Sequence, residues 1–137
     1  MTEMKNFNEK IIEEFRANNG RVAMFADFPM IILHTIGSKS GKTFLVPLVL
    51  TIKDGEMLLF ASFAGAKKHP AWVFNLRANP GITVEVGDET FAARAVELAE
   101  TEAKSTVQRQ AHVSEQFAKY VESAAPRDIP VFRIDRI

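Results

Sequence analysis

The sequence predicts a mainly β domain of the α+β class, a small and mostly antiparallel barrel with helices packed outside it. Two turn pairs, Asp54-Gly55 and Gly87-Asp88, each separate apolar strand-like runs and so predict two β-hairpins. Further strand-like runs stand before the first hairpin and near the end of the chain, and helical patterns surround them. At 137 residues, one domain over residues 1–137 is expected.

The first element is an amphipathic helix over residues 5–18, within an N-terminal segment of residues 1–20. Apolar residues recur there at helical spacing with charges between them, at Phe7, Ile11, Ile12 and Phe15. Asn18-Asn19-Gly20 supplies the stop. The stripe favours packing on the core or on another subunit, and a membrane surface is the alternative.

The barrel core is expected over residues 30–98. Met30–Ile36 is a β-rich run, and Thr43–Lys53 is nearly continuously apolar and is predicted as one strand, with Met57–Phe63 as its partner. Such a continuous apolar strand is typical of burial on both faces. Pro47 cannot donate to a strand ladder, which indicates an edge, a bulge or a ligand-facing stretch.

The second half continues this alternation. Pro70–Ala78 predicts a short helix with proline in its first turn. Residues 82–86 and 91–98 form the second hairpin. Apolar periodicity predicts one long helix over residues 100–122, and residues 129–134 predict a closing strand.

Composition excludes several classes of protein. The 17 basic and 17 acidic side chains cancel, which argues against nucleic-acid binding. The absence of cysteine excludes thiolate metal sites and cysteine nucleophiles. No signal peptide is expected, and no apolar run reaches about 18 residues. We expect a cytoplasmic protein, and peripheral membrane contact stays open.

Residues 37–43 (GSKSGKT) resemble a phosphate-binding loop only in part. The P-loop pattern needs glycine where Ile36 stands and a helix after Thr43, but a strand with Pro47 follows. The two glycines, two lysines and hydroxyls could still bind a phosphate or carboxylate. A plain polar loop is the alternative.

Residues 61–72 form the second candidate site. A loop of mostly small residues leads from a strand into a helix N-terminus, where free amides favour anions. Small side chains also allow a flat ring system to approach the backbone. The alternative is a tight connection in which Trp72 belongs to the core.

No catalytic constellation is visible. His34, His69 and His112 lack partners at metal-ligand spacing, and we predict no metal site. We interpret His34 as a hydrogen-bonded core residue, His69 as flanking a helix and His112 as exposed. No nucleophile elbow is present, so an enzyme with this sequence would rely on a cofactor.

Several strings resemble the signatures of the deazaflavin-dependent nitroreductase family. The likeness runs from about residue 31 to 131 and rests on Ile32–Gly41 with Pro47-Leu48, on His69–Trp72, Asn75-Leu76, Ala78–Pro80 and Val84–Gly87, and on Ile129–Val131. This resemblance implies a split β-barrel, similar to FMN-binding barrels, that binds coenzyme F420. It implies an oxidoreductase that moves hydride from the reduced coenzyme to a small-molecule acceptor such as a quinone, enone or nitro compound.

The resemblance also implies roles for individual residues. Lys39, Ser40, Gly41 and Lys42 would meet the acidic tail of the coenzyme. The ring or its linker would be lined by Pro47, Leu48, Val49, Ala61, Ser62, Trp72 and Asn75. Substrate would lie near Met24, Phe25, Phe117 and Tyr120, and the candidate catalytic hydroxyls are those of Ser62 and Tyr120, with Tyr120 as proton donor.

Three features depart from the family pattern. On the late helix, where some members place tyrosines around the substrate, this chain has Ser114, Phe117 and Tyr120. Phe44 stands where the family usually has arginine, and Phe63 where it often has lysine, so two cations that would face the tail are absent. Two alternatives follow: a non-enzymatic barrel that holds a fatty acid or another apolar ligand, or a barrel that uses FMN. A homodimer through the apolar residues 44–50 is also left open.

Overall fold

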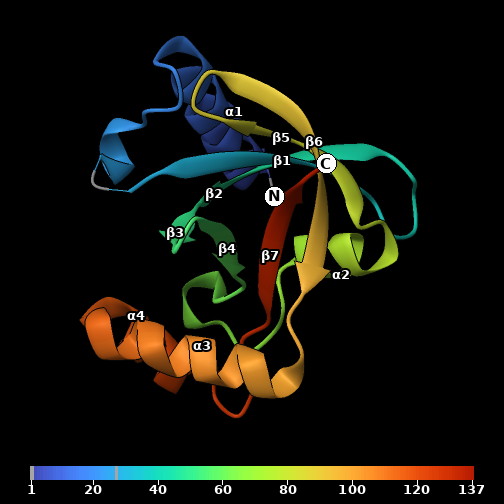
Figure 1. Ribbon diagram of the computed structural model, residues 1–137. Helices are drawn as coiled ribbons and strands as arrows, with labels where there is room; N and C mark the ends of the chain where they lie inside the picture. The colour runs from blue at the N-terminus through green and yellow to red at the C-terminus, as the bar shows by residue number, and fades with distance from the viewer. Residues whose placement is uncertain (1, 27) are drawn as a thin grey trace.

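A computed structural model describes residues 2–26 and 28–137, with side chains from Asn6 onward. Within these residues, seven antiparallel strands form one curled sheet in the order β2-β1-β5-β6-β7-β4-β3, and four helices lie outside it (Figure 1). The strands are β1 Met30–Ile36, β2 Thr43–Val49, β3 Thr51–Lys53, β4 Glu56–Phe60, β5 Gly81–Val86, β6 Glu89–Glu97 and β7 Val131–Arg136. The helices are α1 Thr2–Ala17, α2 Ala71–Ala78, α3 Glu100–Val113 and α4 Glu115–Ala124, with 3-10 turns η1 Ala23–Phe25 and η2 Phe63–Gly65. The predicted mainly β class is confirmed.

The prediction of one strand over residues 43–53 is wrong. β2 pairs with β1 and β3 pairs with β4, so the two segments lie at opposite edges of the sheet. The chain crosses between these edges at Leu50, which is buried and whose amide donates to the Pro29 carbonyl at 2.9 Å. An unbroken apolar run does not mark this crossing. Pro47 does lie on an edge strand, as predicted.

Burial on both faces occurs in β1 instead of β2. Alternate β1 residues point to opposite faces, so Ile31 and Leu33 enter the barrel core while Met30 and Ile32 pack under α1. None of the residues of β2 is fully buried. In the isolated chain, β2 therefore leaves an apolar edge partly open to solvent.

The predicted long helix over residues 100–122 is in fact two helices. The chain is extended at Ser114 (φ −133°, ψ 109°), and Ser114 Oγ accepts from the Phe117 amide at 3.2 Å. Serine caps helix starts well, whereas apolar periodicity continues across such a break. Both helices pack at the opposite end of the barrel from α1 (Figure 1), over Leu58 and Val131.

The other predicted boundaries shift by a few residues. The N-terminal helix spans 2–17 and not 5–18. The second strand of the first hairpin ends at Phe60 and not Phe63, and the closing strand spans 131–136 and not 129–134. Within the described residues, no helix is both long and apolar enough to cross a membrane.

Candidate functional site

An apolar pocket of about 210 Å³ lies where the end of β2 faces the segment after β4. It is lined by Leu48, Val49, Leu59, Phe60, Ser62, Phe63, Ala64 and Trp72. Four of the residues predicted to contact a ring system (Leu48, Val49, Ser62 and Trp72) are therefore brought together, and Ala61 is buried beside them. Pockets for drug-sized ligands usually enclose about 300–1,000 Å³, so this one suits part of a larger molecule, such as a flat ring.

One wall of this pocket is a left-handed turn. Phe63, Ala64 and Gly65 all have positive φ, at 48°, 53° and 81°. For a residue with a Cβ this conformation costs about 1–2 kcal/mol, so Phe63 and Ala64 are held in it by their surroundings. Gly65 has no such cost, and a Cβ there would approach Ser123 Cβ of α4 to 2.8 Å. Strained backbone of this kind concentrates at binding sites.

Arg127 is the residue that the sequence reasoning missed. Its guanidinium donates to the carbonyl oxygens of Ala61, Ser62 and Ala66, at 3.1, 2.9 and 3.0 Å, and to His69 Nδ1 at 2.9 Å. Burial lowers the pKa of Arg127. The pKa of His69 is lowered by burial and by the nearby Arg127 charge, which keeps its ring neutral and able to accept. No local pattern around Arg127 marks it, because its partners are about sixty residues away.

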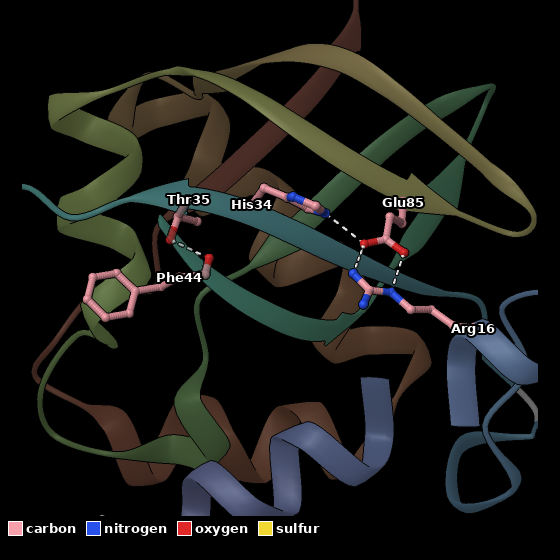
Figure 2. A network of polar contacts seen from close by, with 5 residues as sticks. All are labelled: Arg16, His34, Thr35, Phe44 and Glu85. Atoms are coloured by element: carbon pink, nitrogen blue, oxygen red, sulfur yellow. Dashed lines mark hydrogen bonds and ion pairs between the residues drawn. The ribbon is translucent and has the colours of Figure 1, made fainter. Parts of the chain in front are cut away.

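The lysine-bearing loop is tied to α2. Asn75 Oδ1 accepts from the Ser38 amide at 3.0 Å, and Asn75 Nδ2 donates to Thr35 Oγ1 at 3.4 Å. Thr35 Oγ1 in turn donates to the Phe44 carbonyl at 3.1 Å, while the Phe44 ring points away from this pair (Figure 2). Asn75 is thus buried beneath the loop, where it binds the start of the loop directly and reaches the Phe44 end only through Thr35. This contact is separate from its predicted role beside the ring.

α2 connects the pocket and this loop. Trp72 and Asn75 are three residues apart and therefore share one face of the helix, Trp72 toward the pocket and Asn75 toward the loop. Lys39, Ser40 and Lys42 are exposed on the loop, and Ser40 Oγ accepts from the Lys42 amide at 3.2 Å. Gly41 has φ +71° with open space around it. The arrangement places two exposed lysines on the loop before β2, and α2 links this loop to the pocket, whose residues Leu48 and Val49 lie at the other end of β2.

The four predicted substrate residues are divided between two places. Met24 and Phe25 lie in η1, where Phe25 packs with the α1 cluster and Met24 is exposed. Phe117 is buried and stacks edge-on against Phe60, a residue of the pocket wall, with ring centroids 5.0 Å apart. Tyr120 is half-buried beside it in α4, which packs against η2. In Figure 1, η1 and α4 lie well apart, so a single chain does not bring the two pairs together.

Phe44 and Phe63 are both unusually exposed for phenylalanine, at 48% and 40%. They stand at positions where a cation was expected, so this part of the site is apolar. Within the described ranges, no group of three histidine, aspartate or glutamate side chains could hold a metal ion. The pocket can bind and orient a flat molecule, and the chemistry would have to come from that molecule.

A second polar network joins α1 to the barrel. Arg16 donates to both carboxylate oxygens of Glu85, at 3.0 and 2.7 Å, and His34 Nε2 lies 2.7 Å from Glu85 Oε2 (Figure 2). Hydrogen bonds from Arg16 and then His34 lower the pKa of Glu85 despite its burial. His34 is hydrogen-bonded as predicted, but its side chain is half-buried and not part of the core, because it lies on β1 where it meets Glu85 near the surface. His112 is exposed on α3 as predicted.

Comparison with known proteins identifies relatives across nearly the whole chain. Residues 8–135 match the family model described as F420H(2)-dependent quinone reductase. An F420H(2)-dependent quinone reductase of Mycobacterium tuberculosis (strain H37Rv) is 31% identical over 83 residues, which cover 59% of this chain and 56% of that protein. The chain therefore spans just over half the length of the curated relatives it matches.

Two solved structures share the fold of this chain, and one of them is an F420-dependent reductase. An F420-H2 dependent reductase (FDR-A) is 34% identical with a TM-score of 0.65, and the match covers 78% of this chain and 94% of that one. A protein described as a domain-swapped dimer is 29% identical with a TM-score of 0.68, covering 97% and 99%. The split-barrel fold implied by the sequence resemblance is confirmed.

Proposed function

We propose that this chain, which belongs to the F420H(2)-dependent quinone reductase family, reduces a quinone-type acceptor with hydride from reduced coenzyme F420. The observation that supports this most directly is the pairing of an apolar pocket, walled by Leu48, Ser62 and Trp72, with the exposed loop of Lys39 and Lys42. The coenzyme has the matching parts, a flat deazaflavin ring and an acidic tail. The relatives give no support to the alternative of a lipid-binding barrel.

When bound, the reduced deazaflavin supplies the hydride, and the protein's residues do the rest. The apolar walls hold one face of the ring and exclude water, so that an acceptor on the other face is positioned for transfer. Reduction of a quinone to a hydroquinone by hydride also consumes one proton. The Tyr120 hydroxyl on α4 and the Ser62 hydroxyl in the pocket wall are the candidate donors.

A second copy of the chain is part of the proposal. β2 is an edge strand with partly exposed apolar side chains, including Phe44 and Val49. The protein described as a domain-swapped dimer matches nearly the full length of this chain. A homodimer that covers β2 would enlarge the walls of the adjoining pocket, because Val49 belongs to both.

The first test is equilibrium binding of oxidised coenzyme F420, with FMN as comparator, at low and moderate salt. We expect F420 to bind more tightly than FMN and to weaken as salt rises, because exposed lysines act through screened charge. Lys39→Ala should weaken binding about tenfold and reduce the salt dependence. Lys53→Ala, on the distant hairpin, is the matched control.

Activity is tested by oxidation of reduced F420 with a soluble quinone such as menadione. Loss of the reduced-coenzyme spectrum at a rate that depends on both enzyme and quinone would support the proposal. Absence of F420 binding at micromolar concentrations, or binding of FMN in preference to F420, would contradict it.

A further inference from the structure

We propose that Arg127 is a positioning residue of the coenzyme site, which holds the loop of residues 61–66 in the shape that forms the pocket wall. The inference rests on the function proposed above. It arises from a juxtaposition that chain order does not reveal: a guanidinium between α4 and β7 meets the loop that follows β4. Arg127 would act through the backbone of this loop, without touching the coenzyme.

The contacts of Arg127 bracket the left-handed turn. Its acceptors are the carbonyls of Ala61 and Ser62 on one side of the turn and that of Ala66 on the other. Between them lie Phe63 and Ala64, the two residues of this turn that have both a Cβ and a positive φ. A donor set that joins both ends opposes relaxation of the strained residues, because a relaxed turn would move these carbonyls apart.

The guanidinium suits this task better than an ammonium group. Arginine presents its N–H groups in a planar, rigid fork, and here Nε, Nη1 and Nη2 each bind a different carbonyl. Nη1 also donates to His69 Nδ1, which fixes the chain just before α2. Lysine carries a compact ammonium group on a flexible four-carbon stem, and its donors do not form a planar fork.

The pocket depends directly on the bracketed residues. Ser62, Phe63 and Ala64 form the wall that faces Leu48 and Val49 of β2, and Trp72 closes the pocket from α2. A shift of the turn would therefore change the space available to a flat ring without altering the lysine loop, which is anchored separately through Asn75. This separation makes the role of Arg127 measurable.

The experiment compares wild type with Arg127→Lys, Arg127→Met and the control Arg109→Lys, an exposed arginine on α3. Two quantities are measured: the Kd for oxidised F420 at two salt concentrations, and the rate of tryptic cleavage at the exposed Lys67 and Lys68 in the absence of coenzyme, followed by mass spectrometry. We expect both Arg127 variants to bind at least tenfold more weakly with an unchanged salt slope. We also expect at least tenfold faster cleavage at Lys67 and Lys68, and no change in Arg109→Lys.

Three results would overturn the proposal. If Arg127→Lys binds F420 as tightly as wild type, the positive charge alone is sufficient. If the salt dependence of the Kd falls in the Arg127 variants, as expected for Lys39→Ala, Arg127 contacts the acidic tail directly. A Kd for F420 equal to that of wild type in both Arg127 variants, whatever the cleavage rate, would show that Arg127 does not shape the coenzyme site. If wild type binds no F420, the proposed function fails, and the cleavage rates alone then decide whether Arg127 holds the loop.

A second substitution keeps the test independent of folding losses. Ala64→Gly removes the strain at φ +53°, so the loop should depend less on Arg127. Added to Arg127→Lys, it should lower the Kd for F420 at least threefold and slow tryptic cleavage at Lys67 and Lys68. If Ala64→Gly restores neither quantity, the left-handed turn is not what Arg127 maintains, and the proposal is wrong.

Discussion

Two arginines, one at each end of the barrel, make forked contacts of opposite kinds. Arg16 meets a carboxylate, Glu85, which also lies against His34, so its charge is compensated. Arg127 meets backbone carbonyls and a neutral histidine nitrogen, so its charge is only solvated by dipoles. The first fork fastens a helix to a regular sheet, and the second shapes an irregular loop.

The difference indicates where stability and function are separated in this molecule. α1 and the sheet could pack through their apolar faces, and the Arg16–Glu85 pair fixes their orientation. The loop around η2 has two strained residues and cannot rely on regular pairing, so it needs an outside donor. Substitutions at the contact between α1 and the sheet should lower stability alone. Substitutions in the loop around η2 should lower stability and also alter the pocket.

Glycine substitutions give the largest expected separation of the two regions. Gly20→Ala (φ +93°) would bring a Cβ within 2.7 Å of Gly87 Cα, and Gly65→Ala (φ +81°) within 2.8 Å of Ser123 Cβ. Each should lower the free energy of unfolding by about 2–4 kcal/mol, from backbone strain and overlap together. Urea unfolding measures this, with Gly55→Ala, which has open space around its Cβ, as the control for strain alone.

Coenzyme binding then distinguishes the two glycine variants. Gly65→Ala should also weaken F420 binding, because it displaces η2 from α4, whereas Gly20→Ala should leave the Kd of the folded protein unchanged. Equal effects on the Kd would remove the distinction between the regions.

An intermediate effect is expected from the Arg16–Glu85 pair. Glu85→Gln leaves Arg16 and His34 without a carboxylate and should cost about 1–3 kcal/mol of unfolding free energy. Glu97→Gln breaks the more exposed Arg77–Glu97 pair and should cost about 0–1 kcal/mol. Thermal or urea unfolding checks both, and a larger loss in Glu97→Gln would contradict the ranking.

Acid should weaken the two regions in sequence, with smaller and graded effects. The folded pKa of His69 is lowered, so the unfolded state binds more protons, and stability should begin to fall as pH drops below about 6.5. The folded pKa of Glu85 is also lowered, so its contribution should be lost only as pH falls below about 4.5. Urea midpoints between pH 7 and pH 4 should show the first loss in wild type and not in His69→Gln.

The elements fixed by nearby residues were predictable from the sequence. The predicted strand Met30–Ile36 has the bounds of β1, and the predicted turns Asp54-Gly55 and Gly87-Asp88 are the two hairpin turns. Both kinds of signal depend only on neighbouring residues. The breaks at Leu50 and Ser114 were not predictable, because the apolar pattern of the sequence continues through both. Each break depends on which distant strand or helix the next segment meets.

The candidate site divides in the same way. The residues that line the pocket on β2 and α2 were indicated by the family resemblance, and the structure brings Leu48, Val49, Ser62 and Trp72 together. Arg127 was missed because its acceptors are far away in the sequence, and Asn75 gained a role under the lysine loop that spacing alone could not assign. The roles of Leu48, Val49, Ser62, Trp72 and Asn75 as coenzyme contacts stay predictions.

The position of β7 constrains how the protein can be made. β7 is the last strand along the chain, yet it pairs between β6 and β4 in the interior of the sheet. While the ribosome synthesises the chain, the edges of β4 and β6 that pair with β7 stay unpaired until residues 131–136 emerge. Exposed strand edges favour pairing with other chains, so the nascent protein is prone to aggregation until residues 131–136 have emerged.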